Sequence, residues 1–286
     1  MAGPTKKPKN SEEAPVESGD ESMSEDSDSG SYHGQQVVQA TFEGRNPEGH
    51  DFHGIKLLLS QLFLGAEIDL GQMADMLIAQ TGVGSVLKQS DLDSDEEDDD
   101  AELVDQAEVY GITSVINLTS HKETPCVVEF YSILDQLIAK HASDEVQQGF
   151  KKILHGRNKL GFLINERFVN IPSKISAAMF NSLYDELQRI QKKDKSYAFD
   201  YLVFICKTSK PKGETDAEEQ FSNDEEEVFR KAADVTFDFS VADQCDTGLE
   251  GRWLSADKQS IPFRRIMLIN YSKLKDVIDE ITILVQ

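Results

Sequence analysis

Apolar residues recur along this chain with the periods of helices and strands, and the pattern starts near residue 37. After Asp51, apolar side chains at offsets of 0, 3, 4, 7 and 8 from Ile55 predict an amphipathic helix. The same offsets return after Asp69, which predicts a second helix with Asp69 as its cap. We expect Ser272 to cap the final helix in the same way. Further helical patterns cover residues 127–138, 144–155, 172–195, 225–232 and 272–285.

Runs of apolar and β-branched residues predict strands between these helices. A strand at residues 83–88 and another at 109–118 enclose an acidic stretch, which predicts a hairpin with that stretch at its tip. The mixture of elements predicts one α/β or α+β domain with a mixed sheet, over residues 35–286. The other predicted strands are residues 37–42, 160–168, 201–208, 234–241 and 263–270.

The negative charge of the chain is confined to three segments. Residues 1–34 have a net charge of −5, residues 91–105 of −10 and residues 214–227 of −8, which together make the whole net charge of −23. The first segment has almost no large apolar side chain, so we expect a disordered acidic tail. The other two are predicted to be acidic inserts in the folded domain.

Concentrated acidity attracts a basic partner and repels the phosphates of nucleic acid. The alternative is that the inserts are solvated loops without a partner. We expect both inserts to bind a basic partner through exposed carboxylates. The candidate residues are Asp95, Glu96, Glu97, Asp98, Asp99, Asp100, Glu225, Glu226 and Glu227.

Three further residues are candidates for contact with a partner. The adjacent charges Glu166 and Arg167 interrupt the apolar strand at residues 160–168. Either one of them faces a cleft or a partner, or the strand lies at an edge of the sheet with solvated side chains. Trp253, the sole tryptophan, lies beside glycines in the run GLEGRW and is either a docking anchor or a cap on the core.

The residues that bind metals in other proteins do not form such patterns here. The three cysteines are scattered without ligand spacing, which argues against structural zinc and fits a reducing compartment. Cys206 lies in the most apolar segment, so we expect a small core residue. His50 and His53 flank Asp51, and we expect a surface turn there rather than a metal site. No metal is therefore predicted.

The glycine-containing run at residues 80–85 (QTGVGS) does not form a phosphate loop. It lacks the lysine of that motif and precedes a strand, whereas a phosphate loop opens a helix. We interpret it as the end of the second helix. The N-terminus shows no secretory signal, and the longest apolar run, residues 201–206, is too short to span a bilayer. We expect no membrane contact.

Several long blocks of this sequence resemble the BCCIP family, a family of eukaryotic nuclear proteins that includes the yeast Bcp-type ribosomal-protein chaperones. The blocks are spread over residues 37–286, nearly the whole chain outside the tail. They are Asp51–Leu64 (DFHGIKLLLSQLFL), Val83–Asp91 (VGSVLKQSD), Tyr110–Thr119 (YGITSVINLT), Gly161–Pro172 (GFLINERFVNIP), Tyr201–Thr208 (YLVFICKT), Arg252 with Trp253, and Pro262–Ile269 (PFRRIMLI).

The resemblance implies a fold similar to the GCN-type N-acetyltransferases (GNAT), without a functional acetyl-CoA site. The pyrophosphate loop of those enzymes needs Gln/Arg-x-x-Gly-x-Gly/Ala at the start of a helix. The run at residues 80–84 has the wrong spacing and lies on the wrong element. The resemblance therefore implies that the protein is not an enzyme and takes no cofactor.

The resemblance also implies partners. They are a basic protein of the large ribosomal subunit, the recombination mediator of the breast-cancer type 2 locus, and the Cip-type inhibitor of cyclin-dependent kinases. We expect a monomeric nuclear chaperone that shuttles to the cytoplasm, binds no nucleic acid directly, and acts in ribosome biogenesis, nuclear export, the cell cycle and DNA repair. The alternatives are a histone chaperone and an acetyltransferase-like enzyme.

Overall fold

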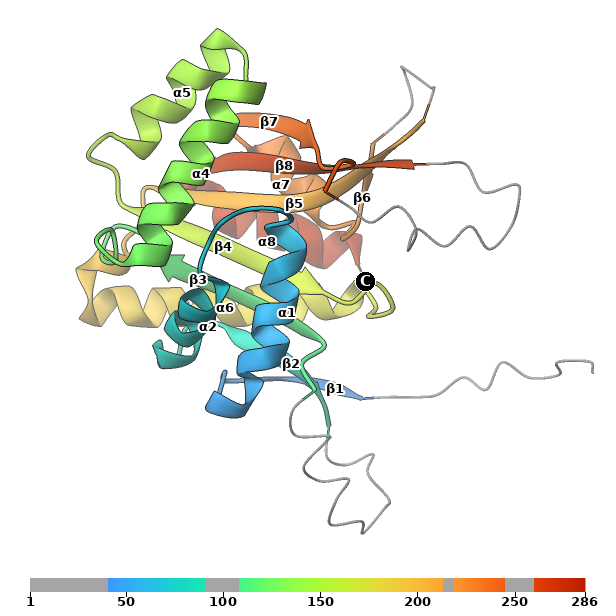
Figure 1. The fold of residues 1–286 in the computed structure, drawn as a ribbon. Coiled ribbons are helices and arrows are strands. Elements are labelled where there is room, and N and C mark those ends of the chain that lie inside the picture. Colours follow the sequence, from blue (N-terminus) through green and yellow to red (C-terminus); the bar gives the residue numbers. More distant parts are fainter. Residues whose placement is uncertain (1–40, 91–107, 213–218, 245–259, 286) are drawn as a thin grey trace, which may run out of the picture. The chain divides into compact units, whose positions relative to one another are not determined.

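The computed structural model describes residues 41–90, 108–212, 219–244 and 260–285. Residues Ala40–Gln286 form one compact unit, shown in Figure 1. The acidic tail, the candidate carboxylates Asp95–Asp100 and the candidate Trp253 lie outside the described residues.

A mixed sheet runs through the centre of this unit. Its strand order is β1-β2-β3-β4-β5-β8-β7, with β6 paired to β5. Neighbouring strands are antiparallel except β4 and β5, which are parallel. The antiparallel pair β2–β3 confirms the predicted hairpin. The strands are β1 (Phe42–Arg45), β2 (Ser85–Gln89), β3 (Gly111–Asn117), β4 (Leu160–Arg167), β5 (Tyr201–Pro211), β6 (Gln220–Phe221), β7 (Val235–Ser240) and β8 (Ser260–Asn270).

Helices cover both faces of the sheet. The front face in Figure 1 carries α1, α2, α4 and α5, and the back face carries α6, α7 and α8. Each face has its own apolar core because side chains alternate along a strand. In β5, Val203 packs into the front core and Phe204 into the back core. The helices are α1 (Phe52–Leu62), α2 (Leu70–Ala79), α4 (Pro125–His141), α5 (Asp144–Leu154), α6 (Lys174–Lys193), α7 (Glu226–Ala232) and α8 (Leu274–Leu284).

The helical periods of the sequence correspond to buried faces. On α1, the predicted apolar positions from Ile55 to Leu62 are buried in the front core. Asp69 caps α2, because its Oδ1 accepts a hydrogen bond of 3.0 Å from the backbone N–H of Gln72. Cys206 is fully buried in the back core, as predicted.

The side chains at two predicted helix starts need correction. Asp51 is the N-cap residue of α1, as its position predicts, but its side chain makes no capping hydrogen bond. It is fully buried and pairs with Lys88 at 2.6 Å, so it is no surface residue. Before α8, Ser272 does not act as the cap. Asn270 takes that role for a short 3-10 turn, because its Oδ1 accepts from the N–H of Ser272.

The strand register places several strand ends at one end of the sheet, which we call the acidic end. Gly111, where β3 begins, pairs with Arg167, where β4 ends. β5 runs parallel to β4 and ends at Pro211, which pairs with Ser260 at the start of β8. Residues 91–107, 213–218 and 245–259 all connect to described residues near this end.

Candidate functional site

Glu166 and Arg167 lie in the interior of the fold. Their exposed fractions are 1% and 8%, and β4 lies between β3 and β5. The Oε2 of Glu166 is 2.5 Å from the Nζ of Lys207 on the front face. Arg167 points to the back face, where its guanidinium binds both carboxylate oxygens of Glu225. The interpretation of an edge strand is therefore wrong, and so is an exposed position for either charge.

The acids at the start of α7 are also mostly buried. Glu225 and Glu226 have an exposed fraction of 0%, contrary to the expectation of exposed carboxylates. Glu226 accepts hydrogen bonds from the side-chain amides of Asn165, at 3.1 Å, and Asn223, at 2.8 Å. Glu227 alone of the three has a partly exposed side chain. The described part of the second acidic run is therefore a structural element, because Arg167 can be buried only beside a carboxylate.

Burial changes the proton affinity of these groups. Burial raises the pKa of Glu226 well above its usual range, and the carboxylates of Glu166 and Glu225 raise it further. Burial also raises the pKa of Glu166, although Lys207 opposes it. For Arg167, burial lowers the pKa, but the hydrogen bond and charge of Glu225 outweigh burial and leave it raised. The buried pairs Arg167–Glu225 and Glu166–Lys207 thus lie close to the carboxyl group of Glu226, whose raised pKa favours its protonated form. We call these five residues the buried ionic layer.

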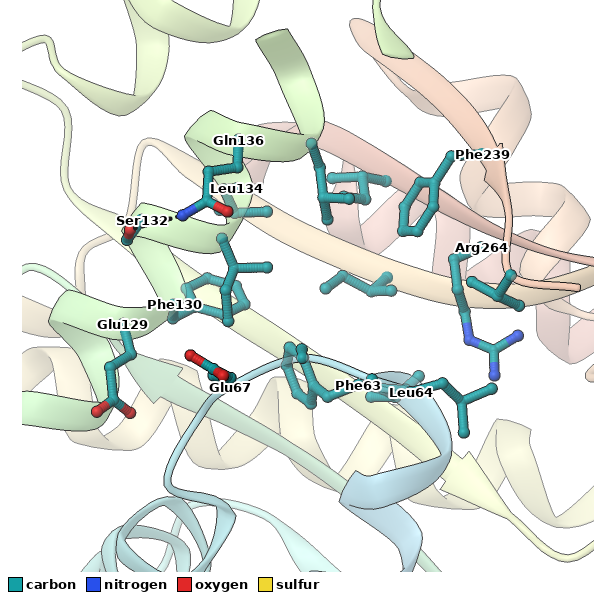
Figure 2. Close-up of a pocket in the computed structure, with 18 of the residues that line it drawn as sticks. Phe63, Leu64, Glu67, Glu129, Phe130, Ser132, Leu134, Gln136, Phe239 and Arg264 are labelled. Carbon is teal, nitrogen blue, oxygen red and sulfur yellow. Dashed lines mark hydrogen bonds between the residues drawn. The ribbon is translucent and has the colours of Figure 1, made fainter. Parts of the chain in front are cut away.

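A groove of about 730 Å³, with both polar and apolar surface, opens on the front face of the sheet (Figure 2). One wall is the loop of residues 62–67 between α1 and α2, and another is α4. Its lining includes Phe63, Phe130 and Ile266, which belong to the front core. Phe63 and Phe130 also meet edge to face, with ring centroids 5.9 Å apart.

Charged groups occupy the two ends of the groove. Figure 2 shows Glu67 and Glu129 at one end and Arg264 at the other. The Oε2 of Glu129 accepts a hydrogen bond of 2.8 Å from the N–H of Asp69. Arg264 donates to the backbone carbonyls of Gln61 and Phe263, which hold its side chain in place. These acids and Arg264 therefore give the two ends opposite charge, and backbone contacts hold Glu129 and Arg264 in place.

The groove suits binding rather than a recognisable reaction. An apolar floor with a few oriented polar groups is typical of sites that hold a ligand or a partner side chain. Among the described residues, its lining includes neither histidine nor cysteine. Across the described residues, no three His, Cys, Asp or Glu side chains gather as a metal site would require. None of the described helices has the length and apolar composition to cross a bilayer.

The groove also adjoins one of the candidate segments. Gln244 lines it and is the last described residue before residues 245–259, which contain Trp253. Val128 on α4 is another lining residue, and 51% of it is exposed. The groove was missed in the sequence because its residues come from α1, α4, β5, β7 and β8, and no local pattern connects them.

These features define a class of protein: a mixed α/β domain with a buried ionic layer and an open groove suited to binding. The sequence model of the BCCIP family matches residues 37–243. The chain therefore belongs to the BCCIP family, as the sequence blocks predicted.

Two relatives show how far this similarity extends. The protein BCCIP homolog of Drosophila melanogaster is 39% identical over 254 residues, which cover 87% of this chain and 86% of that protein. The human BRCA2 and CDKN1A-interacting protein is 33% identical over 256 residues, which cover 85% of this chain and 80% of that protein. The name of the human relative describes a protein that interacts with BRCA2 and CDKN1A.

A solved structure has a similar fold. The crystal structure of BCP1 from Saccharomyces cerevisiae matches with a TM-score of 0.55 and 18% identity, over 90% of this chain and 92% of BCP1. At this identity the likeness concerns the fold alone. It confirms the predicted mixed α/β fold.

Proposed function

We propose that this chain is a non-enzymatic nuclear binding protein that chaperones a basic protein of the large ribosomal subunit. The observation that carries the proposal is the arrangement of the strand ends. Residues 91–107, with ten acids and no base, and residues 213–218, with three acids and no base, both connect to the acidic end of the sheet. Their charge therefore acts from one side of the domain on a basic client.

The charge alone would bind weakly at each contact. One exposed ion pair contributes about 0.2–1 kcal/mol, and salt screens it. Several pairs together would neutralise the Lys and Arg side chains that the client uses on ribosomal RNA. The client would then pass to RNA, whose phosphates present a far denser negative charge.

The groove supplies the contacts that charge lacks. Specificity needs buried, shape-dependent contacts beside the charge. From the sequence we expected Trp253 and the strand containing Glu166 and Arg167 to supply these contacts, but that strand is internal. We assign the role to the groove instead, with an apolar client side chain on its floor and a client base beside Glu67 and Glu129.

Family membership supports a binding role. The human relative is named for interaction with BRCA2 and CDKN1A, a cyclin-dependent kinase inhibitor, and we extend those two partners to this chain as part of the proposal. The proposal includes a fold similar to the GNAT enzymes, which the family resemblance implies and with which the element order β1-α1-α2-β2-β3 agrees. Shuttling between nucleus and cytoplasm, and a monomeric state, complete the proposal.

A binding assay with purified components tests this function. We expect the chain to bind a basic large-subunit ribosomal protein at low salt, to bind it less tightly at moderate salt, and to prefer it over core histones in competition. Failure to bind any basic ribosomal protein at either salt would refute the proposal. Preference for histones would favour the histone chaperone, and tight binding of acetyl-CoA in calorimetry would favour the enzyme.

A further inference from the structure

The end of the sheet opposite the acidic end carries a cluster of basic side chains, which we call the basic end. Leu160 and Tyr201, where the parallel strands β4 and β5 begin, pair there. The bases come from the C-terminal parts of α5 and α6 and from the loops that lead into these two strands. They are Lys151, Lys152, Arg157, Lys159, Arg189, Lys192, Lys193 and Lys195.

The two basic segments lie side by side. The backbone N–H of Asp200 donates to the carbonyl of Lys159 at 2.8 Å, and the Nζ of Lys159 donates to the carbonyl of Lys195 at 2.8 Å. In Figure 1 the loops into β4 and β5 lie together on the left of the sheet. Seven of the eight bases are exposed, and Lys159 is half-buried. The loops that carry Arg157, Lys159 and Lys195 therefore form one continuous surface, which adjoins the C-terminal ends of α5 and α6 along the chain.

Helix stabilisation explains only part of this cluster. Lysines in the last turn of a helix interact favourably with its carbonyl end, which accounts for Lys151, Lys152, Lys192 and Lys193. Three of the other bases lie outside both helices, so interaction with the carbonyl end of a helix does not explain their position. They are Arg157, Lys159 and Lys195.

Two exposed acids lie in the cluster and reduce its net positive charge, but the eight bases outnumber them. Asp194 accepts a hydrogen bond from the N–H of Ser196, at 2.8 Å, and Asp200 accepts one from the N–H of Lys159, at 2.7 Å. Both carboxylates are thus held by the backbone, and Asp194 also interacts with the charge of Lys159. None of the eight bases forms an ion pair with a carboxylate of the described residues.

Distance separates this surface from the acidic end. β5 spans the sheet with 11 residues, from Tyr201 to Pro211. At about 3.3 Å per residue this is about 35 Å. The Debye length is about 8 Å at physiological ionic strength, so charge at one end contributes little to the potential at the other. The net charge of −23 therefore does not describe the basic end.

We infer that the basic end binds the phosphate backbone of a nucleic acid. A phosphate backbone needs spaced cations and no apolar anchor. A membrane surface or an acidic protein segment would be held by apolar contacts as well as by charge. The exposed large apolar side chains of the described residues lie on other elements. They are Leu57, Val128, Val169, Ile283 and Leu284.

This surface differs from what the composition predicts. Acidity repels phosphate, and we expected no direct nucleic acid contact from the sequence. That expectation considers only the acidic segments, whereas the fold also gathers bases at the opposite end of the sheet. A client at the acidic end and RNA at the basic end could then be bound by one molecule, although the binding of nucleic acid does not depend on the client.

Fluorescence polarisation with the full chain tests the inference. The probes are labelled single-stranded RNA and DNA of one sequence, titrated over a range of salt. The test variant combines Lys152→Gln, Lys192→Gln and Lys195→Gln. The control makes the same charge change outside the basic end, with Lys56→Gln, Lys174→Gln and Lys210→Gln. Thermal unfolding of both variants checks that they fold.

We expect the unaltered chain to bind both probes at low salt. The test variant should bind at least about tenfold more weakly, and the slope of log affinity against log salt should fall by about 2, since each phosphate contact contributes about 0.7 for single strands. The control should bind like the unaltered chain. Equal affinity for RNA and DNA would assign the contact to phosphate alone. Tighter binding of RNA would show that the protein also contacts the ribose sugar.

Three results would overturn the inference. They are no binding at low salt, equal weakening in both variants, and equal affinity for polyglutamate or for phosphatidylserine vesicles. None of these results would affect the proposed client, because the acidic end and the groove proposed for it include none of the eight bases.

Discussion

The two acidic runs of this chain look alike in the sequence but differ in the fold. The run at residues 91–105 lies between the ends of β2 and β3 and outside the described residues. In the described part of the run at residues 214–227, Glu225 and Glu226 are built into the interior, where Glu225 binds Arg167. Glu219 similarly lies 2.7 Å from Arg265 of β8. A run of acids can thus either bind a partner or form ion pairs with buried bases of the same chain. Which of the two occurs depends on where those bases lie in the fold.

The largest expected effect comes from breaking the buried pair. Arg167→Ala leaves Glu225 buried without its cation, and this should lower the free energy of unfolding by about 3–5 kcal/mol. Chemical denaturation measures the loss. The control is Arg230→Ala, which removes an exposed pair with Glu227 on α7 and should cost less than about 1 kcal/mol. Similar losses in the two variants would show that burial does not distinguish these acids.

A second prediction concerns pH. Because the pKa of Glu226 is raised in the folded state, the folded chain binds more protons than the unfolded chain above about pH 4.3, the usual pKa of glutamate. Stability from this group is therefore present at low pH and is lost as pH rises toward the folded pKa, by up to about 1.4 kcal/mol per pH unit. Glu226→Gln has no such proton to lose, so its stability relative to the unaltered chain should increase with pH.

Denaturation over a pH series measures this difference. Glu227→Gln is the matched control, because the pKa of Glu227 is lowered, first by its hydrogen bond with Arg230. Its stability relative to the unaltered chain should not increase with pH. A flat pH response of Glu226→Gln would contradict the account of the buried ionic layer.

A smaller effect is expected at the groove. Val128→Asn removes an apolar contact for the client and should raise its dissociation rate about fivefold, equivalent to about 1 kcal/mol. Val169→Asn is the control, because Val169 is 89% exposed and does not line the groove. Surface plasmon resonance measures both rates. Equal rates for the two variants would exclude the groove as the client's apolar contact.

Local features of the fold could be predicted from the sequence. The apolar period of α1, the cap at Asp69 and the hairpin of β2 and β3 depend on neighbouring residues, and the structure confirms each of them. These elements follow from the spacing of side chains and from turn chemistry within a few residues. The order of the strands in the sheet does not follow from such spacing.

Contacts between distant residues could not be predicted. Arg167 and Glu225 are 58 positions apart, and nothing in either segment shows that they bind each other. The sequence therefore pointed to Glu225 and Glu226 as exposed carboxylates. The groove and the basic end were missed for the same reason, because the fold assembles each from separate segments.

The central claim is that the acidic run at residues 91–105 attracts the client. Its most direct test is the association rate with a basic large-subunit ribosomal protein, measured over a range of salt. The variant replaces the ten acids of this run with Ser and Asn, and its stability should stay within about 0.5 kcal/mol of the unaltered chain. We predict association about tenfold slower at low salt and a flatter salt dependence. Unchanged rates and salt dependence would contradict the claim.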